Sequence, residues 1–127
     1  MKSRENAVRV KEFAVREKRR RLAQLDLMIG EFDRMANDLT LQIEFEERKA
    51  GSNDPNHFAY PTFAKAARLR RDNIKNSQAD LADKRAAAVD DVTIAEGELS
   101  RAEALDHREG RVPAPLPERN DASSMIG

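Results

Sequence analysis

The sequence contains no cysteine and no tryptophan, and only 5% of its 127 residues are aromatic. The absence of cysteine excludes a disulfide framework and a thiolate zinc site, and it fits a reducing compartment. Charged residues make up 36% of the chain and hydrophobic residues only 39%. A globular core of normal size is therefore not available.

Long hydrophobic runs are also missing. No apolar stretch approaches the roughly 20 residues that a membrane span requires, and the charged start Met1-Lys-Ser-Arg-Glu5 is not followed by the apolar region of a secretory signal. The formal net charge is zero, so no global attraction to nucleic acid or to acidic membranes is expected. We expect a soluble, cytoplasmic protein that reaches a membrane only indirectly, through a partner.

What the chain does contain is a seven-residue repeat of apolar side chains. In a first segment, residues 3–50, two sets of apolar residues have the spacing of the a and d positions of a coiled coil. The first set is Val8, Val15, Leu22, Ile29, Ala36 and Ile43, and the second is Leu25, Phe32 and Leu39. Charged residues interrupt the d positions at Lys11, Lys18 and Glu46. We expect one helix, with Ser3 as its N-cap and Gly51 ending it at positive φ.

A second segment with the same repeat follows a break at residues 51–60, where Asn53-Asp-Pro55 has turn chemistry. The second helix is expected to run from about residue 61 to 109, with Pro61 at its first position and Gly110 as its terminator. Its stripe consists of Ala67, Ile74, Leu81, Ala88, Ala95 and Ala102, reinforced by Val92 and Leu99. The proline-rich residues 111–127 are expected to form a disordered tail.

The charges are arranged in blocks that indicate how the two helices pair. Residues 1–21 and 64–75 are strongly basic, whereas residues 31–48 and 80–109 are strongly acidic. An antiparallel hairpin places each basic block beside an acidic one, and a parallel homodimer stacks like charges. The sequence therefore predicts an all-α fold, an antiparallel coiled-coil hairpin of two long helices over residues 1–110.

No feature of the sequence indicates catalysis, a metal site or a cofactor. Adjacent carboxylates such as Asp90 and Asp91 point in different directions on a helix and have no cleft to desolvate them. The histidines His57 and His107 would lie far apart in a hairpin, and no phosphate-binding loop or hydrolase motif is present. We expect a non-enzymatic protein.

Two groups of residues are candidate partner-binding surfaces. The first lies near the turn and consists of the off-stripe residues Leu41 and Phe45 with the aromatic residues Phe58, Tyr60 and Phe63. Either these side chains pack on one another to close the turn, or they form an apolar docking patch. The sequence leaves both interpretations open.

The second candidate surface is a basic cluster in the first helix, formed by Arg16, Lys18, Arg19, Arg20 and Arg21. It is expected to pair with the second helix or to contact another protein. A nucleic-acid interface is the less favoured alternative, because no aromatic rings are interleaved with these charges. We expect no nucleic-acid partner.

Several segments carry a resemblance to a known family. They are the start Met1–Glu5, the block Val15-Arg-Glu-Lys-Arg-Arg20, the turn block Asp54-Pro-Asn-His-Phe-Ala-Tyr-Pro61, and the run Phe63-Ala-Lys-Ala-Ala67 that leads to Arg70-Arg-Asp-Asn73. Over roughly residues 1–105 the chain resembles the flagellar export protein FliJ family in its alphaproteobacterial form. The turn block carries most of the resemblance, because it is not a heptad pattern.

The resemblance implies a coiled-coil rod of the flagellar type III secretion apparatus, cytoplasmic and peripheral to the inner membrane at the flagellar base. Such a protein binds the export ATPase, the export gate protein FlhA and export chaperones, and it is not an enzyme. The turn residues would then contact the gate, and the basic cluster would contact the ATPase. The alternatives are a generic coiled-coil adaptor or scaffold that oligomerises and, less favoured, a nucleic-acid binder.

Overall fold

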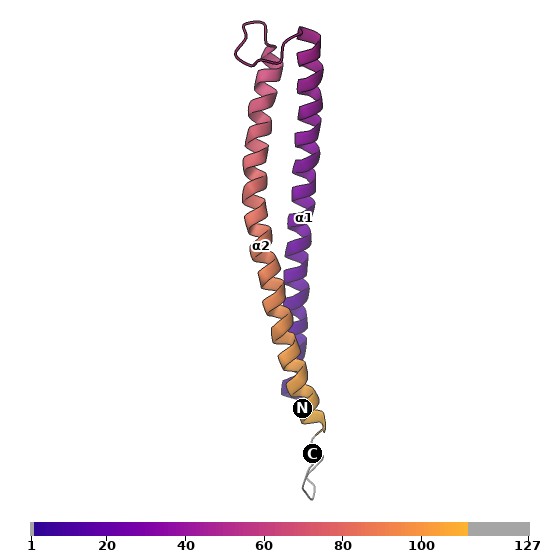
Figure 1. Cartoon of the computed structure of the whole chain (residues 1–127). Coiled ribbons are helices and arrows are strands. Elements are labelled where there is room, and N and C mark those ends of the chain that lie inside the picture. Colours follow the sequence, from indigo (N-terminus) through magenta and orange to yellow (C-terminus); the bar gives the residue numbers. More distant parts are fainter. Residues whose placement is uncertain (1, 112–127) are drawn as a thin grey trace, which may run out of the picture. The chain divides into compact units, whose positions relative to one another are not determined.

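The computed structural model describes residues 2–111. It consists of two α-helices, α1 (Lys2–Ala50) and α2 (Thr62–Arg111), connected by a loop of residues 51–61 (Figure 1). The described residues contain no strand. The prediction of an all-α helical hairpin is confirmed, whereas the expected tail lies, from residue 112 onward, outside the described residues.

The end of α1 is where the sequence predicts it. Gly51 has a φ of 74°, a left-handed conformation that glycine adopts without steric cost. Its N–H donates to the carbonyl of Arg48 at 3.3 Å, and the N–H of Ser52 donates to the carbonyl of Glu47 at 3.2 Å. These two hydrogen bonds define a Schellman motif, which satisfies the last carbonyl groups of the helix.

Both helices begin at residues other than those predicted. α1 already includes Lys2, so Ser3 lies inside the helix and is not its N-cap. α2 begins at Thr62, because the carbonyl of Pro61 accepts the first helical hydrogen bond, from the N–H of Lys65 at 3.1 Å. A residue that lies outside the helix but whose carbonyl accepts the first helical hydrogen bond is the N-cap. Pro61 is therefore the N-cap of α2, one position before the first helical position that was predicted for it.

The predicted terminator of α2 is also wrong. The helix continues through Gly110 to Arg111. A glycine costs a helix only about 1 kcal/mol relative to alanine, and α2 already contains Gly97 in its interior. A single glycine that is not in a left-handed conformation does not stop the helix.

The contacts between the helices divide the hairpin into two units, each with a piece of α1 and a piece of α2. Residues 20–89, with the connecting loop, form the tip unit. Residues 1–19 and 90–127, of which 2–19 and 90–111 are described, form the terminal unit.

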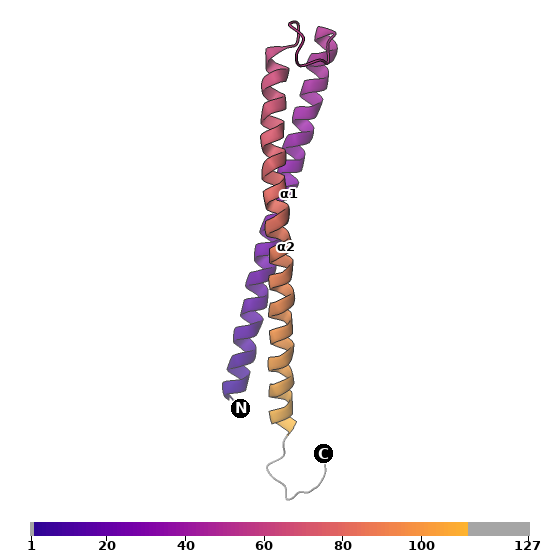
Figure 2. The ribbon, with the colours of Figure 1, turned by 60° about the vertical axis from the view of Figure 1, so that its left-hand side comes forward.

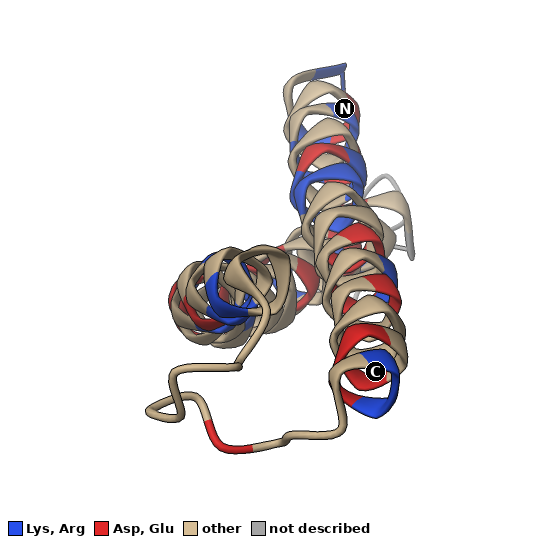
Figure 3. Ribbon diagram, turned by 90° about the horizontal axis from the view of Figure 1, so that it is seen from above, with Lys and Arg blue, Asp and Glu red and all other residues tan. Residues whose placement is uncertain are grey.

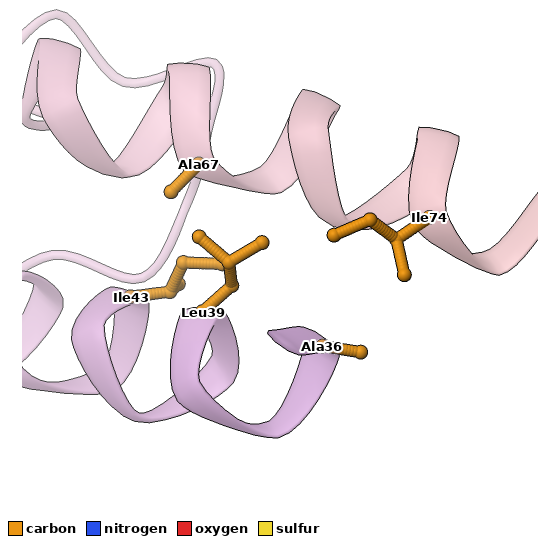
Figure 4. Close-up of a cluster of buried hydrophobic side chains, with 5 residues drawn as sticks. All are labelled: Ala36, Leu39, Ile43, Ala67 and Ile74. Carbon is orange, nitrogen blue, oxygen red and sulfur yellow. The ribbon is translucent and has the colours of Figure 1, made fainter. Parts of the chain in front are cut away.

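The core of the tip unit is the predicted apolar stripe. One buried cluster joins both helices and consists of Ala36, Leu39, Ile43, Ala67 and Ile74. In Figure 4 the side chains of Leu39 and Ile43 point from α1 toward α2. A second cluster consists of Leu25, Leu81 and Ala88, and the predicted core residues Leu22, Ile29 and Phe32 pack half-buried against it. Alternating alanines with larger side chains lets the helices approach closely.

The terminal unit has a smaller core. Val15 and Ala95 are buried, while the predicted core residues Val92 and Leu99 are only half-buried. Ion pairs between the helices accompany this thin core, and they join Arg4 to Glu109, Lys11 to Glu98 and Arg19 to Glu96. The predicted alignment of the basic start of α1 with the acidic end of α2 is confirmed.

A row of polar residues accompanies the apolar stripe of the tip unit, and we call it the polar row. Its α1 members recur every seventh residue and bond to α2 members that also recur every seventh residue: Asp26 with Arg85, Asp33 with Gln78, and Thr40 with Arg71. The partners advance along α1 as they recede along α2. Only antiparallel helices in one register can form all three contacts.

Two glycine substitutions should shift stability in opposite directions. Gly51→Ala should lower the free energy of unfolding by about 1 kcal/mol, because alanine resists the positive φ there. Gly30→Ala should raise it by up to about 1 kcal/mol, since an added Cβ would meet only the end of the Arg34 side chain, at 3.8 Å. Urea denaturation followed by far-UV circular dichroism measures both, and a neutral Gly51→Ala would contradict the assigned helix end.

Candidate functional site

The loop that connects α1 to α2 (Figure 2) is held by its own hydrogen bonds. The N–H of Asn56 donates to Oδ1 of Asp54 at 3.0 Å, and the N–H of His57 donates to the carbonyl of the same aspartate at 3.0 Å. Further along, the N–H of Ala59 donates to Nδ1 of His57, and the N–H of Tyr60 donates to the backbone carbonyl of His57, both at 3.0 Å. Aspartate and asparagine side chains favour such turns because they bond to nearby backbone.

A three-membered side-chain network joins this loop to both helices. The hydroxyl of Tyr60 donates to Oε2 of Glu47 at 2.7 Å and accepts a hydrogen bond from Nε of Arg68 at 2.7 Å. Nη2 of Arg68 donates to the same carboxylate oxygen at 2.8 Å. Each group therefore bonds to the other two, and the network ties the end of α1, the loop and the start of α2 together.

The network also shifts the pKa values of its three members. Hydrogen bonds from Arg68 and then from Tyr60 lower the pKa of the Glu47 carboxyl. Burial, followed by the hydrogen bond to the carboxylate, raises the pKa of the Tyr60 hydroxyl, and the bond to Glu47 raises the pKa of the Arg68 guanidinium. The group is thus an ion pair bridged by a neutral phenol, and each charge favours the other.

Tyr60 is not available as a docking residue. Its side chain is buried, together with that of Ala64, which the sequence analysis did not single out. Of the two interpretations left open for the aromatic residues near the turn, packing inside the hairpin holds for Tyr60. This corrects its inclusion in the predicted gate-binding set.

The other four residues of that set are exposed. Phe58 is 96% exposed, Leu41 is 64% and Phe45 is 56%, and Phe63 is exposed as well. Leu69 of α2, in the same unit, is also exposed and was not predicted, although its position off the α2 stripe was visible in the sequence. We call Leu41, Phe45, Phe58, Phe63 and Leu69 the apolar tip surface. Within it, Leu41 and Phe45 are four residues apart on α1, so they are neighbours on the helix surface.

A hollow of about 600 Å³, open to solvent, lies between the last turns of α1 and the loop. Its lining carries charges of both signs and includes Glu44, Arg48, Ser52, Asn53 and His57. Phe58, next to His57 in sequence, stacks on the imidazole with ring centroids 4.6 Å apart. The hollow thus sits beside the most exposed aromatic ring.

The predicted basic cluster is exposed, and the boundary between the two units falls within it. Figure 3, which colours Lys and Arg blue and Asp and Glu red, shows charges of both signs on each helix. Arg19 pairs with Glu96 of α2, as the pairing interpretation expects, and Arg20 also has an interaction within the structure. Arg16 lies over the ring of Phe13, with its guanidinium carbon 5.9 Å from the centroid. Lys18 and Arg21 are exposed.

The polar row was not predicted, because the seven-residue repeat of the second segment was followed only through its apolar residues. A signal was present: stepping back by seven from Leu99 and Val92 leads to Arg85, Gln78 and Arg71. These positions belong to the same seam of α2. Apolar residues occupy it in the terminal unit, and polar residues occupy it in the tip unit.

No group of three or more His, Cys, Asp or Glu side chains within residues 2–111 is placed to hold a metal ion. In the same range neither helix is long and apolar enough to cross a membrane. The chain matches no family model, no curated protein and no solved structure. Fold and surfaces together define a helical-hairpin protein with exposed apolar and basic faces.

The network at the turn should make stability depend on acid pH. Because the pKa of Glu47 is lower in the folded protein than its ordinary value of 4.5, the carboxylate stabilises the fold above that value. This contribution is lost as the pH falls through the lowered folded pKa. Glu47→Gln should therefore flatten the loss of unfolding free energy between about pH 7 and pH 3, measured by urea denaturation.

Tyr60→Phe is the companion variant. It removes one donor to the carboxylate but keeps the ring, and it should cost about 1 kcal/mol at neutral pH. Its acid sensitivity should fall between those of the parent protein and Glu47→Gln. If both variants lose stability on acidification as steeply as the parent, the network does not contribute as described.

Proposed function

We propose that this protein is a non-enzymatic component of the flagellar type III export apparatus. In this proposal the hairpin couples the export ATPase to the export gate protein FlhA and assists the delivery of chaperone-bound substrates. The observation that carries the proposal is the turn block Asp54–Pro61. It accounts for most of the resemblance to the FliJ family, and it builds a hydrogen-bonded loop that displays Phe58 almost fully to solvent.

The gate contact is assigned to the apolar tip surface. A loop whose backbone is already held by hydrogen bonds loses little conformational entropy on binding, and this favours affinity. Phe58 is the natural anchor, because burying a fully exposed aromatic ring gains more than burying any half-exposed neighbour. Tyr60 contributes indirectly, since its network holds the loop in place.

The ATPase contact is assigned to the basic cluster. Arg16, Lys18 and Arg21 are exposed, and arginine is well suited to bidentate contacts with carboxylates of a partner. Arg19 is already paired with Glu96, so it would have to exchange partners or remain with α2. Within the proposal the protein acts at the cytoplasmic side of the inner membrane, at the flagellar base.

A coiled-coil scaffold that self-associates is the second candidate. It is favoured by exposed apolar side chains on α2 outside its stripe, which are Leu69, Val89, Ile94 and Leu105. A mass that stays monomeric over a wide range of concentration would exclude it.

The test of the proposed function is a pull-down from the native lysate of a flagellated cell. The tag is placed at the C-terminal side, the salt is near physiological, and nuclease is added. Recovery of the export ATPase and of FlhA is the expected result. Recovery of the protein alone would instead support the scaffold, and material lost on nuclease treatment would indicate a nucleic-acid binder.

Binding to the purified cytoplasmic domain of FlhA should depend on the apolar tip surface. The double variant Leu41→Ala/Phe45→Ala and the single variant Phe58→Ala should each weaken binding by about tenfold or more. Because these side chains are exposed, the circular dichroism spectra should not change.

The control is Leu27→Ala. Leu27 is also exposed on the outer face of α1 in the tip unit, but it is farther from the turn in sequence. It should leave the affinity unchanged. Equal affinity of all the variants would exclude the apolar tip surface as the gate contact.

A further inference from the structure

The terminal unit exposes two large apolar side chains on α1. Val10 is 64% exposed and Phe13 is 57% exposed. They are three residues apart, so they are neighbours on the helix surface. The seam toward α2 is marked by the buried Val15, and in a heptad with Val15 at a, both residues fall at the outward c and f positions. This face of α1 has no partner within the described residues that would cover it.

Arginines frame these two residues. Arg9 is four residues before Phe13 and Arg16 is three after it, and both are exposed. The guanidinium of Arg16 lies over the Phe13 ring, 5.9 Å from its centroid, a cation–π contact that keeps the charge at the edge of the apolar surface. Glu17, an acidic residue on the same outer face, already takes part in an interaction within the structure.

Other basic residues of this segment have a different role. Arg4, Lys11 and Arg19 turn toward α2, where they pair with Glu109, Glu98 and Glu96. The segment therefore has two basic faces. One is neutralised by α2, and the other, around Val10 and Phe13, carries an apolar centre with a positive edge.

The chemistry of this outer face selects its occupant. A second copy of the chain that docks through the same face would bring Arg9 and Arg16 against their own counterparts, which is unfavourable. A lipid surface requires a broader apolar face than two side chains supply. A helix with aliphatic residues at helical spacing and carboxylates beside them matches both the centre and the edge.

We propose that the outer face of α1 around Val10 and Phe13 binds an acidic amphipathic helix of a partner protein. The partner helix packs its aliphatic side chains on Val10 and Phe13, and its carboxylates pair with Arg9 and Arg16. The inference extends beyond the proposed function and does not rest on it, because it names the chemistry of the bound segment and not the protein that carries it.

The test uses a fluorescent helical peptide of about three heptads, with Leu at a and d and Glu at e and g. Anisotropy titration of the full chain should show binding that weakens as salt increases. The variant Val10→Ala/Phe13→Ala should weaken it by about tenfold or more. Arg9→Gln/Arg16→Gln should weaken it and also reduce its salt dependence.

Ile94→Ala is the matched control, because Ile94 is exposed on α2 of the same unit and should not affect binding. All these side chains are exposed, and circular dichroism checks that each variant folds. The proposal is overturned if the parent chain does not bind the peptide, if a peptide with Lys in place of Glu binds equally well, or if Val10→Ala/Phe13→Ala retains full affinity. Binding of phosphatidylglycerol vesicles with the same dependence on Val10 and Phe13, without peptide binding, would replace it with a lipid site.

Discussion

The antiparallel register of α1 and α2 is the constraint on which the rest of the structure depends, and polar contacts specify it. The apolar stripe repeats every seven residues and is rich in alanine, so its period alone does not distinguish one heptad register from the next. The polar row and the network of Glu47, Tyr60 and Arg68 distinguish between registers. A shift by one heptad would separate the partners of the polar row and break these hydrogen bonds. Apolar contacts therefore supply cohesion, and hydrogen bonds supply specificity.

This division of roles leaves the outer faces of the helices available for partners. In the tip unit, Tyr60 is buried in the network with Glu47 and Arg68, and this network holds the loop that exposes Phe58. In the terminal unit, Arg4, Lys11 and Arg19 form ion pairs with α2. A second set, Arg9 and Arg16, lies around the exposed Val10 and Phe13. Each unit thus has an inward face that maintains the hairpin and an outward face with apolar side chains.

The sequence predicted the fold well because the seven-residue period, the charge blocks and the positive-φ glycine at residue 51 are local or periodic signals. It could not separate Tyr60 from Phe58, since both are aromatic residues of the same loop. What separates them is Glu47, thirteen residues away from Tyr60, and Arg68, eight residues away, and those contacts exist only once the loop has folded. The polar row was not predicted from the sequence, for a related reason. Arg71, Gln78 and Arg85 break an apolar pattern, and their role becomes visible only beside Thr40, Asp33 and Asp26.

Thiol cross-linking tests the central claim, that the polar row pairs the two helices of one chain in this register. The sequence contains no cysteine, so only introduced thiols react. The double variant Asp33→Cys/Gln78→Cys, treated with a short bifunctional thiol reagent, should cross-link rapidly within a monomer. The variant Asp33→Cys/Arg71→Cys, one heptad out of register, should react slowly. Equal rates for the two pairs, or cross-links mainly between chains, would contradict the register and with it the assignment of the inner and outer faces.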